Sequence, residues 1–511
     1  MPRPWPRLVL LFPALLLAAP LAAQLPPLTA PKGMVRLEFG GRFDNWDKMY
    51  FAGSKQDAAG DFIRDPVNGA WLPSLAEVER RLKAITGAVS VSLSLGKTSA
   101  HELVNVGTES IGAAYGLTSR LTVFGTIPYV RVRVQDVVSL DSTNATAGFT
   151  PASGDVATQT STFLANFGSA LRSLSDKIAA GTIDPAQLAM AQATLARGTA
   201  LRDSLLAFFG TSKFTPLQGT AAAAAINGSV DSIRTRLNSD FGIPLTAVPG
   251  FPTDGVPHDA LESLATDPNG DIQAQPFEPP ILRYLGDIEV GAAFAWLDHR
   301  PRTGGLMVRS ALQGTIRLRT SKLPDPASFF SIGTGDRQPD LQGDVVTDVG
   351  AGHFGARVTA RYVLQLPGRQ NRRLTPPDHP IAPASTLAGV ERDPGEIVEG
   401  VLEPYVRIAS HFSIVGGIRH WMKGADKYTY APNQAPIEGT SPDVLAIGSK
   451  ENGTVLTAAL SLVHDGLRKD GTVGAPLEAV LRGEWVVGSG EGRVPAKQSL
   501  SFQLRIYHKL F

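Results

Sequence analysis

Apolar and polar residues alternate along most of this chain, and this period of two constrains the fold more than any other feature. Successive side chains of a β-strand point to opposite faces, so each alternating segment predicts a strand with one apolar and one polar face. One segment lies near residues 34–43, and others recur from residue 105 to the end of the chain. Most have about ten residues or more, the length that a tilted strand needs to cross a bilayer.

The amino terminus has the composition of an export signal. Arg3 and Arg7 precede an apolar run from Leu8 to Leu17, and a stretch of small residues ends at Ala23. This pattern predicts a signal peptide at residues 1–23 and an exported mature chain. The apolar run is too short for a transmembrane helix, and no later apolar stretch is long enough either.

The composition excludes several classes of site. Cysteine is absent, which excludes disulfides, a thiol nucleophile and cysteine-bound metals. The formal net charge is +1, so the chain lacks the basic excess that favours nucleic acid. The histidines do not have the spacing of a zinc site, and no Gly-x-Ser-x-Gly elbow is present. We therefore expect no metal, no cofactor and no enzymatic activity.

The connections between the expected strands alternate in length. Short links fall at 116–120, 298–304, 351–353 and 409–411, and long links at 135–283, 320–340, 367–395 and 424–452. Outer-membrane barrels have short periplasmic turns and long extracellular loops. The pattern predicts an all-β fold, a transmembrane antiparallel up-and-down β-barrel of about 12 strands in residues 24–511. The alternating segment 89–95 leaves 14 strands as an alternative.

The last segment of the chain fits the closing strand of such a barrel. Its apolar residues from Leu500 to Ile506 share one face, and the chain ends on Phe511, as many of these barrels do. Phe511 lies out of phase with the apolar face. A bulge or a frayed last turn near His508 would reconcile the two phases, and Tyr507 is then the candidate for the aromatic girdle.

Two stretches depart from the strand pattern. Ser74-Leu75-Ala76-Glu77 is a capping box and precedes apolar residues at helical spacing. Residues 150–260 are rich in alanine, and Asp184-Pro185 predicts a helix start within them. Strand parity places both stretches on the extracellular side, so residues 150–260 are a helical insertion within the barrel domain. Helices that pack on one another are expected, and a plug or lid over the barrel mouth is the alternative.

The polar face of the expected strands carries charges whose sign changes from strand to strand. A charge that faces lipid at the bilayer midplane costs roughly 2–4 kcal/mol, so these residues are expected to face the lumen. Strands lie about 4.8 Å apart, which lets opposite charges pair across the sheet. The candidate lumen-facing residues are Asp287, Glu289, Arg309, Arg317, Arg319, Asp344, Asp348, Arg357, Arg361, Glu399, Glu403, Arg407, Arg419, Lys423, Glu478, Arg482, Glu484 and Arg505.

These charges have two interpretations. They either satisfy a wet interior, or they form a polar constriction that steers a solute. The mixed signs argue against strong selectivity for anions or cations. Outside the strands, Asp267-Pro268-Asn269-Gly270-Asp271 has carboxylates at a spacing that suits calcium, but it lacks the later glutamate of an EF-hand, and a turn is expected instead.

Three motifs support a family resemblance. One is the hairpin Tyr115-Gly116-Leu117-Thr118-Ser119-Arg120-Leu121, followed by Pro128-Tyr129. The others are the strand Gly286-Asp287-Ile288-Glu289-Val290-Gly291 and the loop Gly333-Thr334-Gly335 with Asp340. They resemble the YGLTDRL…PY, GD-x-E-x-G and GTG…D motifs of the phenol-degradation meta-pathway transporter-like outer-membrane proteins. The resemblance covers residues 105–135 and 282–366, and the helical insertion is not part of it.

The resemblance implies a barrel that passes small, often aromatic or apolar, compounds, distantly similar to long-chain fatty-acid channels. We therefore expect an outer-membrane protein that acts as a passive channel or uptake protein for small molecules. Its expected partners are outer-membrane lipid, lipopolysaccharide, the barrel-assembly machinery and a small-molecule solute. One alternative is a non-transport barrel that anchors a helical surface-interaction module, and another is an outer-membrane enzyme that acts on lipid.

Overall fold

A closed antiparallel β-barrel of 12 strands forms most of the molecule. The computed structural model describes residues 28–87, 91–246, 248–301, 305–409, 411–464 and 476–509. The predicted signal peptide at 1–23 and the terminal Phe511 lie outside these residues. The barrel strands are β1 (Met34–Trp46), β4 (Lys97–Gly116), β5 (Leu121–Asp141), β9 (Glu289–His299), β10 (Met307–Arg317), β11 (Asp340–Ala351), β12 (Phe354–Gln365), β15 (Ile397–Arg407), β16 (Phe412–Lys423), β18 (Glu451–His464), β19 (Leu477–Gly488) and β21 (Gln498–Lys509).

The first and last strands close the barrel. β1 pairs with β21 from Met34 opposite Lys509 to Asn45 opposite Gln498, without a break in register. The bulge predicted near His508 is therefore absent from the described part of β21. On the other side β1 pairs with β4, and β4 pairs with β5 along its whole length. β5 then pairs with β9 and, farther along, with the short strand β8 (Leu282–Leu285).

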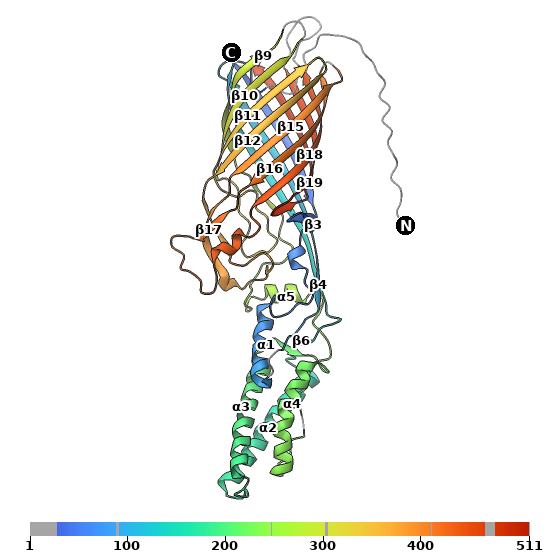
Figure 1. Cartoon of the computed structure of the whole chain (residues 1–511), viewed down its shortest axis with the longest axis vertical. Helices are drawn as coiled ribbons and strands as arrows, with labels where there is room; N and C mark the ends of the chain where they lie inside the picture. The colour runs from blue at the N-terminus through green and yellow to red at the C-terminus, as the bar shows by residue number, and fades with distance from the viewer. Residues whose placement is uncertain are drawn as a thin grey trace, which may run out of the picture.

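Short and long connections alternate around the barrel, as the sequence predicts. The helices and the long loops gather at one end, and β21 finishes at the other end (Figure 1). By the rule for outer-membrane barrels, the end with the long loops faces the outside of the cell. The prediction of 12 strands is confirmed, and the 14-strand alternative is wrong. Its candidate segment forms no strand at 91–96, where Val91, Leu93 and Leu95 are instead buried in the extracellular core.

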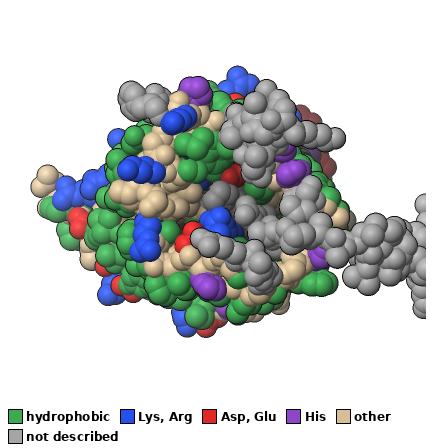
Figure 2. All heavy atoms as spheres, turned by 90° about the horizontal axis from the view of Figure 1, so that it is seen from above, with side chains coloured by type: hydrophobic (Ala, Val, Ile, Leu, Met, Phe, Trp, Pro, Cys, Tyr) green, Lys and Arg blue, Asp and Glu red, His purple; other side chains and the backbone are tan. Residues whose placement is uncertain are grey.

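Large apolar side chains cover the outside of the barrel. Leu37, Phe39, Val290, Leu402 and Phe502 are among those that alternate with lumen residues and are 39–48% exposed. In the view onto the short-turn end, hydrophobic side chains form much of the outline (Figure 2). A closed barrel leaves no strand edge unpaired, and an apolar band around it matches the hydrocarbon core of a bilayer. The protein is therefore an outer-membrane β-barrel.

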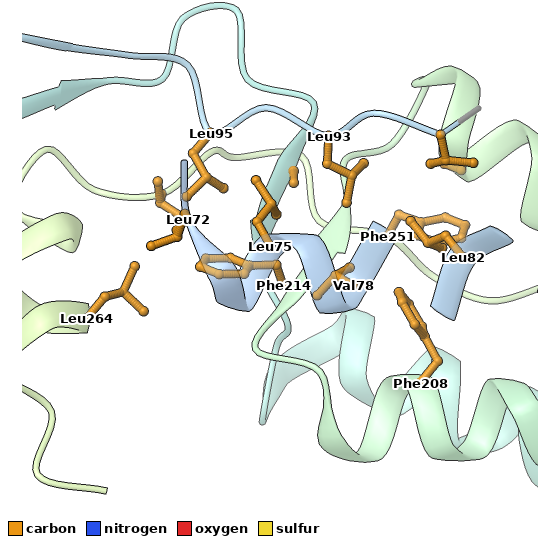
Figure 3. Packing of buried hydrophobic residues seen from close by; sticks show 14 of the residues in the cluster. Leu72, Leu75, Val78, Leu82, Leu93, Leu95, Phe208, Phe214, Phe251 and Leu264 are labelled. Atoms are coloured by element: carbon orange, nitrogen blue, oxygen red, sulfur yellow. The ribbon is translucent and has the colours of Figure 1, made fainter. Parts of the chain in front are cut away.

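A helical domain occupies the extracellular side. It contains α1 (Pro73–Thr86), α2 (Gly154–Ala179), α3 (Leu188–Thr211), α4 (Ala221–Thr235) and, nearest the barrel, α5 (Ala260–Thr266). The first four helices pack on one another and extend away from the barrel mouth (Figure 1). Leu75, Val78 and Leu82 of α1 meet Phe208 and Phe214 in their core (Figure 3). No helix in the described part of the chain is long and apolar enough to cross a membrane.

The long loops also carry short strands. They form three small sheets made of β2 (Lys48–Phe51) with β3 (Ser54–Asp57) and β20 (Arg493–Pro495), of β13 (Gly368–Arg373) with β14 (Leu387–Asp393) and β17 (Lys427–Tyr430), and of β6 (Ala147–Phe149) with β7 (Phe214–Pro216).

Candidate functional site in the barrel lumen

The lumen contains most of the charged residues that the sequence singles out. The parity of each strand is fixed by the apolar residues on its outer face, so the alternate positions point inward. All 18 candidates except Arg319 are buried or half-buried. Arg319 is exposed, because it lies two residues beyond the end of β10 at Arg317.

A buried cluster around Asp348 occupies the lumen toward the short-turn end. The side chain of Asp348 is 0% exposed and accepts from the guanidinium of Arg309 and, at 3.1 Å, from that of Arg357. The hydroxyl of Tyr405 donates to its other oxygen at 3.1 Å. Arg407 lies nearby on β15 and donates to the carbonyl oxygen of Gly352 at 2.8 Å. This cluster ties β10, β11, β12 and β15 together by polar contacts.

A second network of ion pairs follows the lumen wall from β11 to β16. Arg361 pairs with Asp344 at 2.6 Å and with Glu399 at 3.0 Å, and Arg419 reaches Glu399 at 3.4 Å. These contacts are lateral, because each one joins two neighbouring strands. Another ion pair joins β19 to β15, although two other strands, β18 and β16, lie between them in the sheet.

The pair Arg482–Glu403 spans part of the bore. Its two side chains meet at 2.7 Å, although β16 and β18 lie between their strands in the sheet. Glu484, also on β19, meets Arg42 of β1 at 3.0 Å over β21. Contacts that skip strands follow chords of the barrel rather than its wall. They therefore narrow the lumen on the side that carries the charges.

Two of the sequence motifs meet at the extracellular mouth. Asp287 interrupts the strand between β8 and β9 and accepts from the backbone amides of Thr320 and Ser321 at 3.1 and 3.0 Å. The hydroxyl of Thr334 donates to the carbonyl oxygen of Leu285 at 2.7 Å. A Cβ at Gly335 would lie 2.4 Å from the Asp287 carboxylate, so this loop position requires glycine. The motifs thus fasten the β10–β11 loop to the barrel wall.

The remaining candidates at the mouth are also paired. Arg317 contacts Glu289 at 3.3 Å and Asp340 at 2.9 Å. Lys423 contacts Asp426 and donates to the carbonyl oxygen of Ser449 at 3.0 Å. Charges at the mouth therefore bind one another and the loops.

Residues outside the 18 candidates also face the lumen, among them Arg36, Glu38, Tyr405 and Tyr507. Arg505 contacts Glu38 of β1 at 3.2 Å and Glu478 of β19 at 3.4 Å. Glu38 also pairs with Arg36. The hydroxyl of Tyr507 donates to Glu478, and Tyr507 is 2% exposed. Its assignment to the aromatic girdle is wrong, because the unbroken register of β21 keeps it on the lumen face. Strand parity in β1, β15 and β21 is the signal that finds Arg36, Glu38, Tyr405 and Tyr507.

A small hollow remains among these charges. It has a volume of about 230 Å³ and mixes polar groups, among them Arg357, Arg482 and Gln503, with the apolar side chains of Val415 and Val480. The hollow lies in the lumen, because its lining side chains all come from inward positions of β12 to β21.

The opposite wall of the lumen has no charge. The inward positions of β4 from Val104 to Gly116 and of β5 from Thr122 to Val134 contain only small, apolar or hydroxyl residues. The neighbouring strand β9 adds Ala293 and Ala295, which are 4% and 9% exposed. We call this surface the uncharged wall: the inward residues of β4 from Val104 to Gly116, of β5 from Thr122 to Val134, and Gly291, Ala293 and Ala295 of β9.

A cluster of aromatic rings lies at the outer end of the uncharged wall. Phe62, Phe277 and Phe330 come from three different extracellular loops, and their ring centroids lie 4.5–6.3 Å apart. They belong to the same buried apolar cluster as Val130 and Val132 of β5. Buried apolar packing thus continues from the extracellular loops into the barrel along one side.

The described part of the lumen contains no cluster of metal-ligating side chains. Within the described ranges, no three His, Asp or Glu side chains come close enough to hold an ion. The candidate calcium loop is a turn, in which the carboxylate of Asp267 accepts from the amide of Asn269 at 2.9 Å. Its other oxygen meets Lys213 at 3.1 Å.

Comparison with known proteins gives a likeness in architecture. No protein-family model matches the chain, and no curated protein matches it. Among solved structures, the COG4313 outer membrane channel from Pseudomonas putida F1 is 9% identical, with 95% of this chain and 100% of that chain covered and a TM-score of 0.42. The transport unit of the autotransporter AIDA-I from Escherichia coli is 8% identical, with 95% and 93% covered and a TM-score of 0.30. A Pseudomonas aeruginosa FadL homologue is 7% identical, with 94% and 90% covered and a TM-score of 0.24.

Proposed function

We propose that this protein is a passive outer-membrane channel for small apolar molecules, aromatic ones among them. The uncharged wall is the observation that carries the proposal. An apolar molecule that moves along it meets alanine, valine, glycine and hydroxyl groups and does not have to displace an ion pair. The buried aromatic cluster at its outer end continues this apolar lining toward the extracellular side.

The charged side of the lumen has a complementary role. Its charges are held by one another, as in Arg361–Asp344 and Arg482–Glu403, so they bind a passing ion weakly. Side chains that cross the lumen also reduce the space for a hydrated solute. Such a lumen favours a small apolar solute over an ionic one.

Two adjacent residues of β4 provide the test. Ser110 faces the lumen on the uncharged wall, and its hydroxyl lies over Gly40, where no side chain competes for space. Ile111 faces lipid and is 64% exposed. Ser110→Trp should lower the uptake of radiolabelled naphthalene by intact cells severalfold, because the indole narrows the path. Ile111→Trp should leave uptake unchanged, because the indole points into the bilayer.

Uptake is compared with that of cells that lack the protein, and folding is checked by heat-modifiable gel mobility. Equal uptake by cells with and without the wild-type protein would refute the channel. Equal loss in both variants would show that the effect comes from the barrel as a whole and not from the uncharged wall.

The alternative function, a barrel that anchors a surface-interaction module, has one observation in its favour. The helices α1 to α4 extend away from the barrel, where a partner outside the cell can reach them (Figure 1). Normal uptake by a variant without the insertion would assign transport to the barrel alone.

A further inference from the structure

Two arginines on the barrel point the opposite way from all the others. In the described barrel strands, every arginine except Arg131 and Arg133 of β5 lies on the lumen face. Arg131 and Arg133 alternate with the inward residues Val130, Val132 and Val134, so they face outward, and both are exposed. Arg283 of β8 lies directly opposite Arg131 in the register and shares its face.

This arrangement is unfavourable without an anion. Like charges directly opposite each other on neighbouring strands destabilise a sheet. Among the described residues, no ion pair involves Arg131, Arg133 or Arg283. Glu109 faces outward one step below Arg131, but it pairs with none of them and leaves an excess of positive charge. The three guanidiniums thus offer hydrogen-bond donors that the protein itself does not use.

A groove in the barrel wall adjoins these arginines. Gly41 and Gly107 face outward, and a Cβ on either would meet nothing within 4 Å. The missing side chains leave a hollow of about 560 Å³. Arg131, Arg283 and the carboxylate residue Glu109 border it, together with the apolar residues Phe43 and Leu500. A second hollow of about 320 Å³ continues from Gly107 to Arg133. The groove therefore joins a basic end to an apolar end on the outer face of the barrel.

The height of the arginines matches that of lipid headgroups. Arg131 follows Val123, an exposed residue near the short-turn end of β5, by eight residues. At about 3.3 Å per residue and a strand tilt of about 40°, this separation is a rise of about 20 Å across a belt that is about 25 Å tall. Tyr129 lies just below, in the position of an interfacial aromatic residue. Arg131 is thus at the extracellular interface.

From these observations we infer that the groove formed by Gly41, Phe43, Gly107, Arg131, Arg133 and Arg283 binds a lipopolysaccharide of the outer leaflet. The phosphate groups of its headgroup accept from the three guanidiniums, and an acyl chain lies along the glycine positions toward Leu500. Arginine is suited to phosphate because its planar fork donates two parallel hydrogen bonds. An anion between Arg131 and Arg283 removes the repulsion between them.

The test is titration of the purified full-length protein with lipid A, followed by native mass spectrometry. The wild-type protein should bind bisphosphorylated lipid A more tightly than dephosphorylated lipid A, by about tenfold or more for loss of the charged hydrogen bonds. Inorganic phosphate alone should neither bind nor compete at millimolar concentration, because it lacks the acyl chains. Equal binding of the two lipids would overturn the inference, and competition by phosphate would identify a simple anion site instead.

Two variants separate charge from shape. Arg131→Gln with Arg133→Gln and Arg283→Gln should lose the preference for phosphorylated lipid A. Gly107→Leu keeps every arginine but fills the groove, and it should also weaken binding. The matched control replaces Arg172, Arg197 and Arg236, which are exposed on the helical insertion, by glutamine and should keep the wild-type preference. Heat-modifiable mobility shows that each variant is folded. Wild-type binding by the first triple variant would refute the site.

Discussion

The carboxylate of Asp348 on β11 connects β11 to three other strands, because Arg309 of β10, Arg357 of β12 and Tyr405 of β15 all donate to it. Asp348→Ala leaves two buried guanidiniums without the carboxylate that they share. Breaking a buried ion pair from one side costs about 3–5 kcal/mol, so the free energy of unfolding should fall by about that amount. Urea titration of the detergent-solubilised protein, followed by gel mobility without boiling, measures the change.

Asp298→Ala is the matched control for Asp348→Ala. Asp298 pairs with Arg300 at 2.7 Å, but both side chains are more than 40% exposed. Removal of such a pair should change the free energy of unfolding by less than about 1 kcal/mol. Similar losses in the two variants would show that the cluster around Asp348 adds no more than a surface ion pair.

At the residue scale, strand parity carries most of what the sequence can predict about the lumen. It places Asp344, Glu399 and Arg482 on the polar face, and the structure shows them buried or half-buried in ion pairs. Parity does not say which pairs form, since Arg482–Glu403 depends on curvature that brings distant strands together. It also leaves Tyr507 ambiguous, because tyrosine suits both an interface and a buried carboxylate such as Glu478.

At the element scale, the β4–β5 hairpin is the clearest departure from a simple barrel. Beyond Val104 it has no partner in β1, and there Glu102 lies opposite Asp136. Burial and the nearby carboxylates of Glu102 and Glu278 raise the pKa of Asp136 to about 8. Burial and Asp57, partly offset by His101, raise the pKa of Glu102 to about 7.

The raised pKa values predict a hairpin that opens as pH rises. Above about pH 4, Asp136 and Glu102 hold protons in the native state that they lose in the unfolded state. The stability that these protons contribute is therefore fully present at low pH and is lost as pH rises through about 8. The loss is about 1.4 kcal/mol per pH unit for each extra proton bound. Limited proteolysis of the full-length protein between pH 5 and 9 should show faster cleavage near residue 140 at high pH. Asp136→Asn should remove most of this dependence, whereas Asp141→Asn, at an exposed residue, should not.

The sequence identifies elements less well outside the barrel than within it. The alternating residues at 91–95 are buried against the helices, and a period of two does not distinguish such a segment from a barrel strand. The helix predicted from a capping box at Ser74 begins at Pro73, with Leu72 as the N-cap residue and no side-chain cap. Proline fixes the first helical φ by itself, so the helix does not need the serine.

At the scale of the whole molecule, the barrel is closed without any help from the helical insertion. No strand pair of the barrel uses a residue between 149 and 253. A Cβ at Gly148 would lie 2.6 Å from the carbonyl oxygen of Asp254, so the two ends of this segment already meet. A two-residue Gly-Ser linker can therefore replace residues 149–253. Leu75, Val78 and Leu82 of α1 are changed to Gln in the same variant, because they lose the helices that bury them.

We expect this deletion variant to reach the outer membrane and to keep heat-modifiable mobility, because its 12 strands retain all their neighbours. The variant with only the three α1 substitutions is the control for α1. If naphthalene uptake persists in the deletion variant, transport belongs to the barrel and the uncharged wall is sufficient for it. If a folded deletion variant loses naphthalene uptake while the control keeps it, the insertion takes part in capturing the solute. That result would contradict transport by the barrel alone. The closed hydrogen bonding of the barrel predicts that it folds without the insertion. Loss of the heat-modifiable band in the deletion variant would contradict this prediction.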